Sequence, residues 1–92
     1  MFSILIPTLN NLPYLKICIE SIKKTSLNKN EILVHVNEDF DGNTRKFLSD
    51  NEIKFTHTPK NVGLCSSINT IVKLSSFSYL IYSHDDMYFC PN

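Results

Sequence analysis

Glycine is scarce in this chain of 92 residues, which holds only Gly42 and Gly63. Because these two stand far apart, neither the G-x-G-x-x-G turn of dinucleotide-binding folds nor the G-x-x-x-x-G-K-[ST] phosphate loop can form. The G-x-S-x-G turn that carries the nucleophile of many hydrolases is also absent. These absences argue against a Rossmann dehydrogenase, a P-loop NTPase and a serine hydrolase.

The chain also has few cysteines and no net charge. Cys18, Cys65 and Cys90 form no C-x-x-C pair, which argues against a zinc site or a disulfide scaffold. Nine basic residues balance nine acidic ones, so no excess of positive charge is available to bind nucleic acid. No apolar run approaches the ~20 residues that cross a bilayer. We expect one cytoplasmic domain, with peripheral membrane attachment of a longer protein as an alternative.

Apolar runs alternate with amphipathic segments along the chain. The runs predict strands at 3–6, 32–36, 53–57 and 79–82. The amphipathic segments between them predict three helices. This alternation is typical of an α/β fold with right-handed crossovers, a mainly parallel four-stranded sheet and helices on both faces. We expect Pro7 to end the first strand, because proline cannot donate to a sheet ladder.

The polarity of the strands predicts their order in the sheet. Ile4, Leu5 and Ile6 are apolar on both faces, as in a strand with neighbours on each side. The segment 53–57 instead alternates apolar and polar side chains, as at a half-exposed edge. With the strands numbered along the chain, these patterns predict the order 3-2-1-4.

Polar loops follow every predicted strand, at 7–11, 37–44, 58–63 and 83–87. In open parallel sheets, ligands bind beyond the carboxyl ends of the strands. Three of these loops lead into helix starts, whose free N–H groups favour an anion such as a phosphate. The ligand site is therefore expected at this edge of the sheet.

Asp85 and Asp86 are the strongest candidates for metal ligands. Adjacent carboxylates repel one another unless a cation or hydrogen-bond donors lie between them, and Mg²⁺ or Mn²⁺ takes oxygen ligands. The alternative is a solvated turn in which one aspartate bonds its own backbone. His84 precedes the pair, but a lone histidine at a strand end is more often structural. His84 and Cys90 together make a poor site for a softer metal.

Four motifs, in order, resemble the family-2 glycosyltransferases, which have the GT-A fold. They are S-I-L-I-P-T-L-N at 3–10, E-I-L-V-H-V-N-E-D at 31–39 followed by D-G-N-T at 41–44, N-V-G-L-C-S-S-I-N at 61–69 and Y-L-I-Y-S-H-D-D-M at 79–87. The family's counterparts are S-I-I-I-P-T-Y-N, E-I-I-V-V-D-D-G-S-x-D-G-T, N-x-G-x-x-x-A-x-N and a D-x-D or x-D-D metal motif. The resemblance covers nearly the whole chain.

The resemblance implies a nucleotide-sugar site with Mg²⁺ or Mn²⁺, and a UDP-sugar is the favoured donor. The implied nucleotide-binding residues are Pro7, Thr8, Leu9, Asn10, Glu38, Asp39, Asn61, Gly63 and Asp85. Glu38 takes the place of the acid that hydrogen-bonds the uracil ring, with Asp39 as the alternative. Asp86 falls to the metal, and Asp85 to the ribose or the metal. Leu9 stands where the family often has an aromatic residue against the base.

The implied activity is the metal-assisted, inverting transfer of a sugar from a nucleotide diphosphate to a saccharide or another hydroxyl acceptor. Family members continue past the metal motif into a segment that binds the acceptor and supplies the catalytic base. We therefore expect residues 1–92 to be the nucleotide-sugar-binding portion, inactive alone, with the base beyond Asn92. Two alternatives remain: a non-catalytic nucleotide-binding module, and a small α/β interaction domain whose acids are merely solvated.

Overall fold

The computed structural model describes residues 3–25, 31–76 and 80–85 of the chain. The elements are β1 (Ser3–Leu9), α1 (Leu12–Thr25), β2 (Glu31–Asn37), α2 (Asn43–Asp50), β3 (Lys54–Thr58), α3 (Gly63–Ile71), a 3-10 turn (Val72–Leu74) and β4 (Leu80–Tyr82). The strands form one four-stranded sheet in the order β3-β2-β1-β4, and every pairing is parallel. The predicted fold class and strand order are confirmed.

Strand β1 lies inside the sheet, as its sequence predicts. It pairs with β2 along its whole length, from Ser3 opposite Glu31 to Leu9 opposite Asn37. On its other side it pairs with β4 over three positions. Ile6 of β1 is fully buried. A strand with two neighbours and both faces covered favours apolar side chains at every position.

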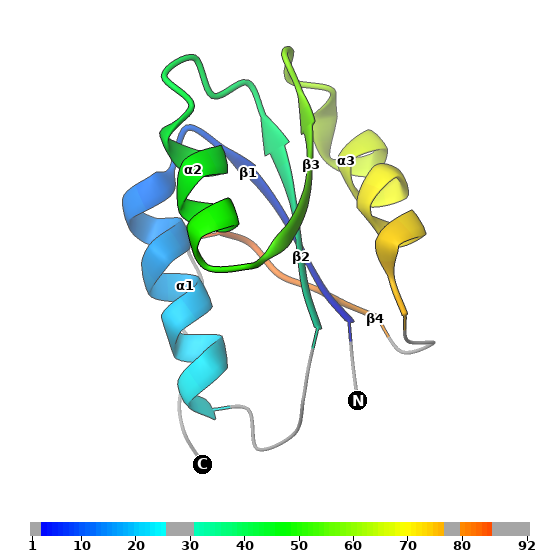
Figure 1. Cartoon of the computed structure of the whole chain (residues 1–92). Coiled ribbons are helices and arrows are strands. Elements are labelled where there is room, and N and C mark those ends of the chain that lie inside the picture. Colours follow the sequence, from blue (N-terminus) through cyan, green and yellow to red (C-terminus); the bar gives the residue numbers. More distant parts are fainter. Residues whose placement is uncertain (1–2, 26–30, 77–79, 86–92) are drawn as a thin grey trace.

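Helices cover both faces of the sheet (Figure 1). Ile6 of β1 belongs to one core with Ile19 of α1 and Leu48 of α2. Leu5 of β1 belongs to a separate core with Ile71 of α3. Successive strand side chains point to opposite faces, which is why neighbouring residues enter different cores. None of the helices described is long and apolar enough to cross a bilayer.

The prediction that Pro7 ends the first strand is wrong, because β1 continues to Leu9. Within a strand, the N–H and C=O of one residue point to the same side, and the side alternates along the chain. The Leu5 carbonyl accepts a hydrogen bond from Ser83 N–H on the β4 side, at 3.0 Å. Pro7 therefore also faces β4, beyond the last pair of that ladder. It removes no bond to β2, and the β1–β4 ladder ends there.

Candidate functional site

A cleft of about 280 Å³ lies at the carboxyl edge of the sheet. Its lining residues are Pro7, Thr8, Leu9 and Asn11 after β1, Asn37 at the end of β2, Asn61, Gly63, Leu64 and Ser67 around the start of α3, and Asp85 after β4. The first two crossovers, through α1 and α2, cover one face of the sheet, and the third covers the other face (Figure 1). The cleft thus lies where the chain switches faces, and open α/β sheets bind ligands at such points.

One hydrogen bond joins the two ends of the chain in this cleft. Thr8 Oγ1 donates to Asp85 Oδ2 at 2.8 Å, across 77 positions of sequence. Thr8 is nearly buried, with 3% of its surface exposed. The bond holds the Asp85 carboxylate beside β1, and within the described residues its other oxygen, Oδ1, accepts no hydrogen bond. Asp86, the predicted metal ligand, lies outside the described residues.

Asn37 is a cleft residue that the sequence motifs did not single out. Its side chain is buried at the end of β2, with 4% exposed. Its Oδ1 accepts the backbone N–H of Val62 at 3.1 Å, and its Nδ2 donates to Ser67 Oγ at 3.0 Å. The sequence places Asn37 in the motif at 31–39 and at the start of the polar loop at 37–44, with no role of its own. The available clue was that it directly continues a buried apolar run.

Helix α3 directs its amino end at the cleft. Gly63 has a φ of +83°, a left-handed conformation that favours glycine, and a Cβ built there would meet nothing within 4 Å. Asn61 Oδ1 accepts the Gly63 N–H at 3.0 Å, while no side chain caps the helix itself. The positive end of the helix dipole therefore favours an anion or a carbonyl oxygen in the cleft. Leu9 and Leu64 add half-exposed apolar walls.

Asp39, by contrast, is committed to the start of α2. Its carboxylate accepts the N–H groups of Thr44 and Arg45 at 3.2 and 3.1 Å, and Arg45 Nε at 3.0 Å. Burial raises the pKa of the Asp39 carboxyl, but these hydrogen bonds and the Arg45 charge outweigh it and hold the pKa below its usual value. Asp41 Oδ1 likewise accepts the Asn43 N–H. The amino end of α2 is therefore occupied by the chain's own acids.

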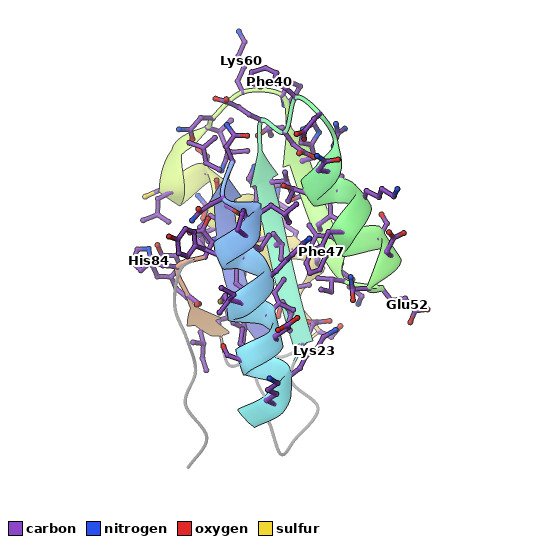
Figure 2. The ribbon with its side chains drawn as sticks, turned by 90° about the vertical axis from the view of Figure 1, so that its left-hand side faces the viewer. Lys23, Phe40, Phe47, Glu52, Lys60 and His84 are labelled. Carbon is purple, nitrogen blue, oxygen red and sulfur yellow. The ribbon has the colours of Figure 1, made fainter. Side chains whose placement is uncertain are left out.

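Glu38 and Asn10 lie near the cleft but do not line it. Both have positive φ, 64° and 47°, in the turns that follow β2 and β1. Asn10 Nδ2 donates to Glu38 Oε1 at 3.5 Å. Asn10 and Asp39 instead line a neighbouring hollow of about 300 Å³. Figure 2 labels Phe40, 89% exposed, and Lys60 at the same end of the molecule, in the loops that follow β2 and β3.

Within the described ranges, no cluster of three or more metal-ligating side chains occurs. Among the described residues that line the cleft, Asp85 is the one carboxylate, and its oxygens fit a hard cation such as Mg²⁺ or Mn²⁺. The His84 side chain is exposed, and its Nδ1 lies 2.9 Å from the Tyr82 hydroxyl. This contact fits the structural interpretation of His84 better than a role as a ligand.

Residues 3–92 match the family described as Glycosyl transferase family 2. The chain belongs to glycosyltransferase family 2. This finding confirms the resemblance of the four motifs and supports a transferase. No curated protein sequence matches the chain.

Solved glycosyltransferases share the fold of this family-2 chain. S. aureus TarS 1-349 in complex with UDP-GlcNAc matches with a TM-score of 0.82 at 20% identity, over 95% of this chain and 27% of that chain. The mannosyltransferase PcManGT from Pyrobaculum calidifontis, in complex with GDP-Man and Mn²⁺, matches with a TM-score of 0.80 at 14% identity, over 92% and 27%. The fold is thus the Rossmann-like GT-A fold. The family-2 chain spans about a quarter of the length of these relatives.

Proposed function

We propose that the cleft binds the nucleotide diphosphate of a sugar donor, with a UDP-sugar favoured, as the donor-binding part of a metal-assisted, inverting glycosyltransferase. The observation that carries this proposal is the Thr8–Asp85 hydrogen bond, which fixes a carboxylate at the switch point of a family-2 chain. The open amino end of α3 lies in the same cleft. Structures of the same fold contain UDP-GlcNAc, or GDP-Man with Mn²⁺, which supports a nucleotide-sugar ligand.

The arrangement of the strands suggests how the nucleotide lies. Neighbouring strands are ~4.8 Å apart, so the ends of β2 and β4, with β1 between them, are separated by about 10 Å. This span suits a nucleotide that crosses the edge, with its diphosphate near Asp85 and its base near β2. The apolar walls, Leu9 and Leu64, then contact the faces of the base. Glu38 lies in the turn after β2, just outside the cleft lining, and would accept a hydrogen bond from a ring N–H of a base that reaches this turn.

Asp85 and Asp86 would hold the cation. Mg²⁺ or Mn²⁺ supplies Lewis-acid stabilisation of the diphosphate leaving group when bound. Asp85 would hold the cation through Oδ1, because Oδ2 already accepts a hydrogen bond from Thr8. Asn61 accepts the Gly63 N–H, so the next N–H groups of α3 would orient the ligand in the cleft.

A nucleotide-binding module without transferase activity is the second candidate, because the chain spans about a quarter of its solved relatives. Transfer requires a base that deprotonates the acceptor hydroxyl. We propose that the catalytic base and the acceptor site lie in a segment equivalent to the part of those relatives that this chain does not match. The 92-residue chain should then bind a donor without transferring its sugar, in an assay with a panel of nucleotide sugars and simple acceptors. Multiple turnover would contradict this expectation.

Calorimetric titration of the chain with UDP, with and without Mn²⁺, tests the proposed function. Without a cation, Asp85 and Asp86 would repel the diphosphate, whereas a bound cation makes the interaction attractive. Binding of UDP should therefore require the metal and vanish when a chelator removes it. Asp86→Ala should lose the metal-dependent part. Asp50→Asn, which removes one acid at the far end of α2, should keep it. Equal affinity with and without metal removes the metal role, and failure to bind any nucleotide removes the function.

A further inference from the structure

The side-chain amide of Asn37 has one defined orientation. The backbone N–H of Val62 can only donate, so the atom that it meets at 3.1 Å must be Oδ1. The Ser67 hydroxyl gives its hydrogen to the Gly63 carbonyl at 2.6 Å, so its oxygen accepts from Asn37 Nδ2. A flipped amide would set an N–H group against the Val62 N–H. The protein therefore fixes which end of the amide is the donor.

A buried network supports this amide from behind. His35 is fully buried on β2, with Nδ1 2.7 Å from Thr56 Oγ1 and Nε2 3.0 Å from Thr58 Oγ1. The Thr58 hydroxyl lies 2.8 Å from the Lys60 carbonyl and 3.4 Å from Asn37 Oδ1. The network joins β2, β3 and the loop that follows β3. The Lys60 carbonyl is the nearer acceptor for the one Thr58 hydroxyl hydrogen, so the network packs against Asn37 on its protein side.

Toward the ligand, Asn37 offers a hydrogen-bond donor. Nδ2 carries two hydrogens. Ser67 takes one, and no acceptor among residues 3–25, 31–76 and 80–85 meets the other. Asn37 is a lining residue, while Asp85, the acidic residue of the lining, is held by Thr8 at the β4 end. The β2 end of the cleft thus combines the Asn37 donor with the amino end of α3.

We propose that Asn37 determines base specificity, with its Nδ2–H donating to a carbonyl oxygen of the nucleobase. This inference rests on the proposed function and deepens it. Uracil, thymine and guanine each carry a carbonyl oxygen next to a ring N–H. A donor from Asn37 and an acceptor from Glu38 match that pair, whereas adenine has neither group. The ligand class is therefore a nucleotide whose base presents adjacent carbonyl and N–H groups.

Asn37→Asp tests the proposal, because the sign of the change in UDP affinity shows whether this position donates or accepts a hydrogen bond. The new side chain has nearly the same shape and can still accept the Val62 N–H, but it replaces the donor with a charged acceptor. We expect UDP, titrated in Mn²⁺, to bind about tenfold more weakly or worse, because the base carbonyl then faces a carboxylate. Asn51→Asp adds the same charge at the far end of α2 and should leave UDP affinity unchanged. Tighter binding by Asn37→Asp would mean that this position meets a ring N–H, and unchanged binding that it meets no ligand; either overturns the proposal.

Ligand choice and folding provide the remaining controls. The wild-type chain should bind UDP at least tenfold more tightly than ADP, and Asn37→Asp should narrow that ratio. Circular dichroism on each variant checks the fold. If Asn37→Asp does not fold, Ser67→Ala provides the test, because it removes the hydroxyl that accepts from Asn37 Nδ2. Ser67→Ala should weaken the affinity for UDP severalfold, and an unchanged affinity overturns the proposal. A wild-type chain that binds no nucleotide removes the proposed function as well, whereas normal wild-type binding with unaffected variants removes this inference alone.

Discussion

At the scale of single residues, two consecutive acids take different parts. Asp39 turns inward and accepts three hydrogen bonds from the start of α2. Glu38 is half-buried, and its carboxylate meets only the Asn10 amide among the residues described. The positive φ angles of both residues turn the chain so that these side chains diverge. Stability and ligand binding should therefore separate between neighbouring positions.

Alanine substitutions at these two positions should separate the two roles. Asp39→Ala should lower the free energy of unfolding by about 1–3 kcal/mol, because buried N–H groups at the start of α2 lose a charged acceptor. Glu38→Ala should change stability by less than about 0.5 kcal/mol. It should instead cost about 1–3 kcal/mol of UDP affinity. Urea denaturation and calorimetry measure the two effects, and the reverse ranking in both would contradict the assignment.

The buried histidine makes stability depend on pH. Burial lowers the pKa of His35, so the folded protein holds it neutral where the unfolded chain takes up a proton. The unfolded state then binds more protons, and stability should fall as the pH drops below the ordinary histidine value of about 6.5. Urea denaturation between pH 7.5 and 5.5 should show this slope. His35→Gln should flatten this dependence of stability on pH, while His84→Gln, at an exposed position, should leave it unchanged. If the dependence persists in His35→Gln, another group causes it.

At the scale of elements, sequence periodicity was sufficient for the strands, helices and strand order. Apolar runs such as 32–36 become strands because parallel strands are covered on both faces. The predicted end of β1 at Pro7 was wrong, because the local sequence does not determine which neighbouring strand the Pro7 nitrogen faces. That side depends on β4, which is paired from the far end of the chain.

The location of the cleft was predictable from the sequence, and its internal hydrogen bonds were less so. Strand ends and motif order directed attention to Thr8, Gly63 and Asp85, which the cleft brings together. The contact of Asn37 was not predicted, because its partner, the Val62 N–H, is distant in the sequence. Roles set by long-range hydrogen bonds leave no local pattern to detect.

Gly63 links the start of α3 to the cleft. Gly63→Ala should cost about 1–2 kcal/mol of stability, because a residue with a Cβ is strained at φ +83°. Its methyl group would stand in the open cleft, so UDP should also bind severalfold more weakly. Gly42→Ala is a matched control, since its φ is +74° and it lies outside the cleft lining. Denaturation and titration of both variants should give similar stability losses but a loss of affinity for Gly63→Ala alone; equal affinities would contradict this geometry.

At the scale of the whole molecule, the surface formed by α3 and β4 is apolar. A groove of about 430 Å³ there is lined by Leu64, Cys65, Ile68, Asn69 and Tyr82. Leu80 of β4 is 46% exposed nearby in the same strand as Tyr82. Contiguous exposed apolar surface favours association, and so does a strand at the edge of the sheet that the described residues form, as β4 is.

The chain should therefore self-associate as its concentration rises. Sedimentation velocity should show a concentration-dependent increase in mass. Leu80→Lys should reduce it, because a charge on the β4 edge opposes pairing. Ile17→Lys provides a matched control on α1, where Ile17 is 48% exposed. A chain that stays monomeric, or equal effects of the two lysines, would contradict association through α3 and β4.

The position of β1 inside the sheet also sets the order of events during folding. Its first residue pairs with Glu31 and with Leu80, so its two neighbours come from distant parts of the chain. Such long-range pairings slow folding, because a large loop must close before the contact forms. On the ribosome, β1 emerges before β2 and gains its second neighbour only after β4 has been made. The Thr8–Asp85 bond spans 77 positions, so the cleft should form only after Asp85 has been synthesised.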